Sequence, residues 1–145
     1  MVNQQFATAV HILTALAFNK KQLMNSEMLA ASVSTNPVVI RRLLSLLTKA
    51  NLVTTLRGKS GGVRLAKEPN MITLKDVYLA INLSESICAN NKTPSKECPV
   101  SCSMQAILST ISDGTQKSIL KYLESQKLSD LIKKIPKQQQ PQLNH

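Results

Sequence analysis

The dipeptide Asn36-Pro37 begins the stretch that most constrains how this chain can fold. Asparagine is favoured just before a helix, because its side-chain oxygen accepts a hydrogen bond from a free amide of the first turn. Proline suits the first helical position, where no amide hydrogen is needed. The apolar residues that follow recur at intervals of three and four, which is the period of one helix face. We therefore expect a helix that buries Ile40, Leu43, Leu44 and Leu47.

The other face of this helix is basic in its first half. Arg42 points away from the apolar stripe, together with Val38, Ser45 and Lys49, and Arg41 lies on its flank. A helix with one apolar face and one basic face is typical of the recognition helix of a helix-turn-helix. We expect a shorter helix before it, capped by Ser26, with a turn at Ser34-Thr35. Its inward residues would be Leu29, Ala30 and Val33.

A short β-ribbon is predicted directly after the recognition helix. Residues 52–56 are rich in β-formers, residues 57–62 form a glycine-containing turn with two cations, and residues 63–65 return as a second strand. Glycine permits the positive φ angles that such turns use. The order of helix, turn, helix and ribbon predicts a winged helix, so the expected fold class is mostly α with a small β-ribbon.

These segments resemble the Rrf-two family of bacterial winged-helix regulators. The resemblance runs from about Phe6 to about Leu131, and the pattern Arg-Gly-x-x-Gly-Gly at residues 57–62 is its most specific part. Within the family the chain is most similar to the YwnA-like branch, through residues 36–42 and through Cys98-Pro99-Val100. The resemblance implies a DNA-binding head, an arginine at position 57 that enters the minor groove, and a long helix that crosses its mate in a homodimer.

The charge distribution agrees with a nucleic-acid partner. The formal net charge is +10, and residues 1–67 hold nine basic residues and a single acid, Glu27, a net of +8. A basic surface over the predicted helix-turn-helix is the expected footprint of a phosphate backbone. We see no signal peptide and no long uncharged apolar run, so we expect a cytoplasmic protein with no membrane partner.

The remaining chain divides into helices and a loop. A helix is expected over residues 2–18, with His11 as a core histidine bonded to backbone, and Thr73 is expected to cap a later helix with Asp76. Ser101 should cap a longer helix that bends near Asp113-Gly114, and Ser129 a final short one. We expect a winged helix-turn-helix head over residues 1–83, a cysteine-containing loop over 84–100, dimerisation helices over 101–135 and a disordered tail over 136–145.

The expected partner is double-stranded DNA. Two heads related by a two-fold axis would bind an inverted-repeat operator, so we expect a homodimer. The function predicted from these features is a sequence-specific transcriptional regulator, in the form of a dimeric repressor that responds to redox or thiol stress. The residues that we expect at the DNA are Ser26, Thr35, Asn36, Val38, Arg41, Arg42, Ser45, Arg57, Lys59, Ser60 and Arg64.

Three cysteines, Cys88, Cys98 and Cys102, lie within fifteen residues and are the candidate sensing residues. Three thiolates can hold a metal or an iron–sulfur cluster. Cluster-binding members of the family add a histidine three residues after the third cysteine, where this chain has Gln105, or an acid from the first helix of the partner subunit. In this chain Gln4 and Gln5 are the nearest polar residues to that acid's place, and no acid precedes Glu27. We therefore expect no cofactor and no metal site. Of the two sensing roles, thiol oxidation is favoured over a metal or cluster, because a cysteine near a helix N-terminus is activated as a thiolate. The third interpretation, that the cysteines have no sensing role, stays open.

Other classes of function find less support. No glycine-rich phosphate loop precedes a helix, no pair of carboxylates lies in an apolar setting, and no Ser/His/Asp set is present, so we expect no enzyme activity. The alternatives that stay open are an iron–sulfur-sensing regulator of the same family and a winged-helix module that binds another protein. A steep loss of binding with rising salt would distinguish DNA from a protein partner.

Overall fold

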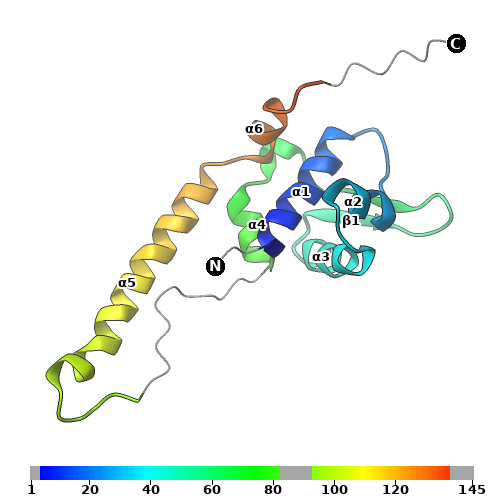
Figure 1. Ribbon diagram of the computed structural model, residues 1–145. Coiled ribbons are helices and arrows are strands. Elements are labelled where there is room, and N and C mark those ends of the chain that lie inside the picture. The colour runs from blue at the N-terminus through cyan, green and yellow to red at the C-terminus, as the bar shows by residue number, and fades with distance from the viewer. Residues whose placement is uncertain (1–3, 82–92, 138–145) are drawn as a thin grey trace, which may run out of the picture.

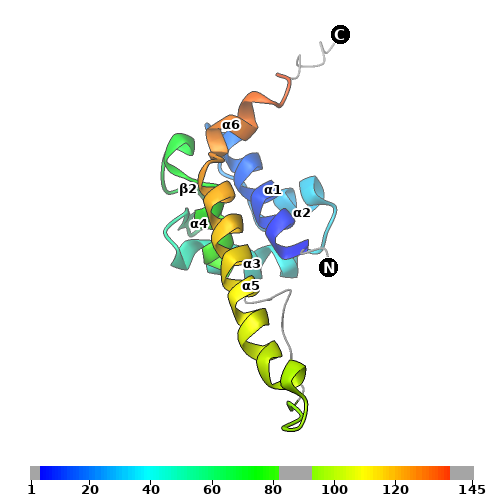
Figure 2. The same ribbon diagram turned by 90° about the vertical axis from the view of Figure 1, so that its left-hand side faces the viewer.

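The computed structural model of the chain describes residues 4–81 and 93–137. Its elements form a helical head that carries a two-stranded ribbon, and one long helix that extends away from the head (Figure 1). In the view turned by 90°, the first turns of this helix again lie beyond the other helices (Figure 2). The elements are α1 (Gln4–Phe18), α2 (Ser26–Val33), α3 (Pro37–Lys49), β1 (Val53–Leu56), β2 (Gly62–Leu65), the 3-10 turn η1 (Pro69–Met71), α4 (Leu74–Ile81), α5 (Pro99–Glu124) and α6 (Leu128–Lys133).

The predicted recognition helix is α3, and its start is as expected. The Asn36 side chain accepts a hydrogen bond of 2.8 Å from the amide of Val38, and Pro37 is the first helical residue. The turn before it is tight, because Ser34 adopts a left-handed conformation with φ 62° and ends α2. The start of α2 differs from the prediction. Asn25 caps it by accepting 2.8 Å from the Met28 amide, so Ser26 is the first helical residue rather than the cap.

The ribbon is antiparallel, with Val53 opposite Leu65 and Leu56 opposite Gly62. Its turn contains Gly58 at φ +112°, a conformation that side chains other than glycine rarely adopt. Gly61 is required for space, because a Cβ there would lie 2.2 Å from the backbone oxygen of Leu56. The predicted strand–turn–strand is therefore confirmed, and its glycines allow the turn to close.

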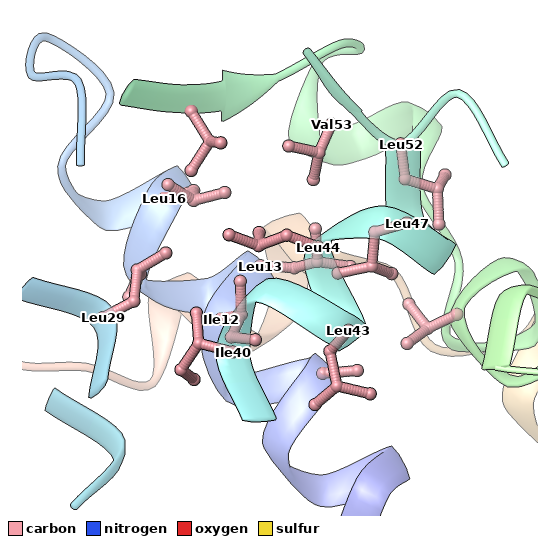
Figure 3. Packing of buried hydrophobic residues seen from close by; sticks show 14 of the residues in the cluster. Ile12, Leu13, Leu16, Leu29, Ile40, Leu43, Leu44, Leu47, Leu52 and Val53 are labelled. Carbon is pink, nitrogen blue, oxygen red and sulfur yellow. The ribbon is translucent and has the colours of Figure 1, made fainter. Parts of the chain in front are cut away.

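The core lies between α1, α2, α3 and the base of the ribbon (Figure 3). Helix α1 is buried on a broad face, as its sequence predicts, and Ile12 and Leu13 are fully buried. Burying one such side chain contributes about 1.5–3 kcal/mol. His11 is not in the core: it is exposed, and its Nε2 lies 3.0 Å from the hydroxyl of Ser32 rather than bonding to backbone. The stripe Ile40, Leu43, Leu44 and Leu47 is buried as predicted.

Helix α4 starts as predicted, and α6 does not. The Thr73 amide donates 2.9 Å to Asp76, and the Asp76 amide donates 3.2 Å to the Thr73 hydroxyl, which completes a capping box. Helix α6 begins after Lys127, whose amide donates 3.3 Å to Asp130, so Ser129 is not its cap. Leu128 is fully buried, and its amide donates 2.9 Å to the Ile72 oxygen. The last helix therefore belongs to the core of the head.

Helix α5 differs from two expectations, one about the residue that caps it and one about a bend near Asp113-Gly114. It begins after Cys98, and the Ser101 hydroxyl accepts a hydrogen bond of 2.8 Å from the Ser95 amide instead of capping the helix. It also runs unbroken through Asp113-Gly114, because a single glycine inside a helix costs only about 1 kcal/mol relative to alanine. Its C-terminal half contacts α4, where the Tyr78 hydroxyl donates 3.3 Å to Gln116.

The first half of α5 carries apolar side chains that stay exposed among the residues that the structure describes. No residue of the helix is buried, and Val100, Ile107 and Ile111 are 63%, 48% and 49% exposed. Met104 and Leu108 fall on the same helix face by spacing, and both are half-buried. Among the helices of the described ranges, none combines the length and apolarity that a membrane span requires.

Candidate nucleic-acid interface

An open hollow lies between the start of α2, the outer face of α3 and the ribbon. Its volume is about 730 Å³. The side chains that bear on its chemistry come from all three elements, and they are Ser26, Glu27, Arg41, Ser45, Lys49 and Arg57. The hollow therefore brings together the helix-turn-helix and the wing, which are the two parts that the sequence predicts to contact DNA.

Cations border this hollow on two sides. Arg41 and Lys49 come from α3, where a spacing of eight residues places them on one helix face, and Arg57 comes from the turn of the ribbon. All three are exposed to solvent. Ser45 lies between the two α3 cations on the same face and can donate its hydroxyl proton. The surface is thus basic and rich in donors, as the binding of phosphate oxygens and base edges requires.

Glu27 is the one acid among the residues that line this hollow. Its Oε1 lies 3.5 Å from Nη2 of Arg41, across the turn between α2 and α3. The two side chains are 66% and 58% exposed, respectively. Arg41 therefore has a charged partner within the protein before any ligand is bound.

Arg64 lies on the other side of the ribbon. Successive residues of a strand point to opposite faces, and Val63 borders the hollow just described, whereas Arg64 borders a second one with Lys20 and Lys67. In the second hollow Lys20 forms an ion pair with Glu68. The structure therefore does not bring Arg64 together with Arg41 and Arg57, although all three were predicted at the DNA.

Other predicted contact residues lie around the same end of the head. Val38 is 63% exposed, and Arg42, Lys59 and Ser60 are exposed outside both hollows. The Asn36 side-chain oxygen is used in the helix cap. Thr35 borders a separate, smaller hollow with His11. Ser26 and Ser45 border the main hollow, as the prediction requires.

The polar residues of the main hollow that were not among the predicted contact residues are Asn25, Glu27, Thr48, Lys49 and Thr55. For two of them a signal was present, because Thr48 and Lys49 follow Arg41 by seven and eight residues and so share its helix face. The Thr48 hydroxyl already donates 2.7 Å to the Leu44 oxygen. Glu27 and Thr55 enter the hollow only through tertiary packing.

Comparison with known proteins decides the family. The sequence profile of the Rrf2 (Rrf-two) family, described as an iron-dependent transcriptional regulator, matches residues 2–134. The chain belongs to the Rrf2 family. YwnA of Bacillus subtilis (strain 168), a candidate helix-turn-helix-type transcriptional regulator, is 37% identical over 132 residues, which cover 91% of this chain and 97% of YwnA. The predicted class, a transcriptional regulator with a winged helix, is confirmed.

Solved structures support the same fold for this Rrf2 chain. A candidate DNA-binding protein superposes with a TM-score of 0.71 at 36% identity, over 88% of this chain and 98% of that one. IscR of T. potens superposes with a TM-score of 0.70 over 95% of this chain and 93% of that one. At 21% identity, the likeness to IscR concerns the fold alone.

Because the family description mentions iron, the positions of the possible metal ligands matter, above all those of the three cysteines. Cys98 is the residue before α5 and makes no side-chain capping bond, and Cys102 lies one turn later. Both are exposed, and Cys88 is outside the described residues. The Cys102 thiol donates to the Ser95 oxygen at 3.2 Å. In the described ranges no three Cys, His, Asp or Glu side chains gather where they could hold a metal ion. The described ranges therefore supply two of the three candidate thiols, Cys98 and Cys102.

Proposed function

We propose that this Rrf2 chain is a homodimeric, cytoplasmic repressor that binds an inverted-repeat operator. In this proposal α3 enters the major groove and the ribbon turn contacts the adjacent minor groove. The observation that carries it is the convergence of Arg41, Lys49 and Arg57 around one open hollow between recognition helix and wing. A repressor acts by occupying promoter DNA and needs no chemistry beyond binding, so we expect no catalytic activity.

The proposal of a dimer depends on α5. The exposed apolar side chains Val100, Ile107 and Ile111 recur at helical spacing on the half of the helix that extends beyond the head. Soluble monomers rarely expose a continuous apolar stripe, and a second copy of the same helix would cover it. Two heads held by this pairing would present two α3 helices to successive major grooves, about 34–36 Å apart.

The signal is proposed to act through the thiols. Cys98 and Cys102 are exposed at the start of the same helix that would form the dimer. Oxidation there would alter the beginning of α5 and with it the spacing of the two heads. The iron–sulfur alternative has less support, because Gln105, Gln4 and Gln5 stand where cluster sensors of the family supply a further ligand.

DNA binding is tested directly by selection from a random duplex library with the purified protein. We expect enrichment of an inverted repeat, and affinity that falls steeply as salt is raised from about 50 to 200 mM. A winged-helix module for protein partners would enrich no sequence and would show no such salt dependence. That result would overturn the proposed function.

A further inference from the structure

The position of Glu27 is unusual for a surface that binds DNA. It is the only acidic residue among residues 1–67, and it lines the hollow that Arg41, Lys49 and Arg57 surround. Its carboxylate lies 3.5 Å from the Arg41 guanidinium. A negative charge here repels phosphate, so it weakens binding to every duplex regardless of sequence.

Stability does not explain why an acid stands at this place. Both partners of the pair are more than half exposed, and exposed ion pairs contribute little to folding. Glu27 does lie in the first turn of α2, where the helix dipole favours an acid. That benefit applies to any first-turn residue, whereas Glu27 is aimed at an arginine of the recognition helix.

We propose that Glu27 is a specificity-determining residue that acts through Arg41, an inference that rests on the proposed DNA-binding function. Both residues belong to the lining of the hollow, and the carboxylate competes with phosphates for the guanidinium. Only a site that offers Arg41 better acceptors, such as O6 and N7 of guanine, replaces this partner. Glu27 therefore weakens non-specific binding more than operator binding, which is how repulsive elements create specificity.

The experiment compares two substitutions that each remove one exposed acid. Glu27→Gln removes the partner of Arg41, and Glu68→Gln removes the partner of Lys20 on the other side of the ribbon. Each variant is titrated with an operator selected by the wild-type protein and with a scrambled duplex of the same length. Glu27→Gln should tighten binding to the scrambled duplex and lower the affinity ratio by about fivefold or more, whereas Glu68→Gln should leave the ratio within about twofold.

The same measurements in an Arg41→Ala background test the role of Arg41. If Glu27 acts through Arg41, adding Glu27→Gln there should no longer change the affinity ratio, a non-additivity expected of coupled residues. Thermal unfolding of each variant separates a loss of helix stability from a change in specificity. The wild type, the variants Glu27→Gln and Arg41→Ala, and the double variant differ at no other residue of the hollow.

The outcomes are distinct. An unchanged ratio in Glu27→Gln, with a wild-type protein that prefers its operator, overturns the inference and leaves the proposed function intact. An equal change of the ratio with and without Arg41 shows a general charge effect and overturns the positioning role. A wild-type protein with no sequence preference overturns the proposed function, and this inference with it.

Discussion

Met24 and Val63 exchange both of their backbone hydrogen bonds. The Met24 amide donates to the Val63 oxygen at 3.3 Å, and the Val63 amide donates to the Met24 oxygen at 2.8 Å. Met24 immediately precedes the cap of α2, and Val63 lies in the strand that leaves the wing turn. This pairing joins the ribbon to the helix-turn-helix, so backbone hydrogen bonds connect the two elements whose cations border the hollow.

The first prediction concerns the wing arginine. Arg57→Ala should lower operator affinity at least about tenfold, because a narrow minor groove attracts an inserted arginine through its negative potential. The fold should be retained, since Arg57 is exposed. Arg64→Ala is the matched control on the opposite face of the ribbon and should lose less. Equal losses in the two variants would mean that the second hollow also faces DNA.

The second prediction separates Arg41 from Arg42. Arg41→Ala should flatten discrimination at one base pair of the operator, which corresponds to about 1–3 kcal/mol for a bidentate base contact. Arg42→Ala should weaken all operator variants by a similar factor, as expected for a phosphate contact. Binding to a set of single-base operator variants measures both. If Arg42→Ala gives the local effect instead, the helix docks rotated about its axis.

The third prediction concerns the first half of α5, which is the proposed dimer surface. Ile107→Lys together with Ile111→Lys should convert the dimer to a monomer in sedimentation equilibrium, because two charges would enter the apolar contact. The head should unfold at nearly the same temperature, since neither side chain is buried in it. Gln105→Lys, elsewhere on the same helix, is the control for added charge. A variant that stays dimeric would place the dimer contact on another surface.

The fourth prediction concerns the thiols. Anaerobic reconstitution with iron and sulfide should leave the protein without stoichiometric iron, because a cluster with an open ligand position is labile. A disulfide oxidant should lower operator affinity in the wild type, whereas Cys98→Ser and Cys102→Ser should respond less. Absorbance, an iron assay and a thiol count follow the two reactions. A brown protein whose DNA affinity tracks the cluster, and not thiol oxidation, would refute this prediction.

Local signals predicted the recognition helix and the ribbon well. Asn36-Pro37 and the glycines of the wing turn determine the conformation of the adjacent backbone, so their effect can be predicted without knowledge of the rest of the fold. The predicted serine caps were wrong, two for local reasons and one for a tertiary reason. The neighbouring Asn25 caps α2 in place of Ser26. The Ser101 hydroxyl bonds to the Ser95 amide, and the pairing of Leu128 with Ile72 keeps the chain extended until the residue before α6.

The sequence predicted which basic residues are exposed on the head better than it predicted which of them lie together. Arg41 and Arg57 were expected together and do border one hollow. Arg64 was expected with them, but the two-residue period of the strand turns it to the other face. The approach of Glu27 to Arg41 joins residues fourteen positions apart and depends on how α2 packs against α3. The spacing of residues within α2 or within α3 therefore does not predict that Glu27 approaches Arg41.

The attachment of α5 to the head at one end gives this helix a mechanical property. Its C-terminal end is fixed to the head, because the Leu74 amide donates 2.9 Å to the Gln126 oxygen and Leu128 is buried, while Cys98 stands at the opposite end. An unbroken helix of 26 residues is about 39 Å long, at about 1.5 Å per residue. Such a helix acts as a lever with its pivot at the head. Because Gln116 still contacts α4, the free part of the helix is its first 17 residues, about 26 Å, and a change of tilt of about 5° displaces its far end by about 2 Å. In the proposed thiol response, such a displacement would change the spacing of the two heads without touching the DNA-binding face.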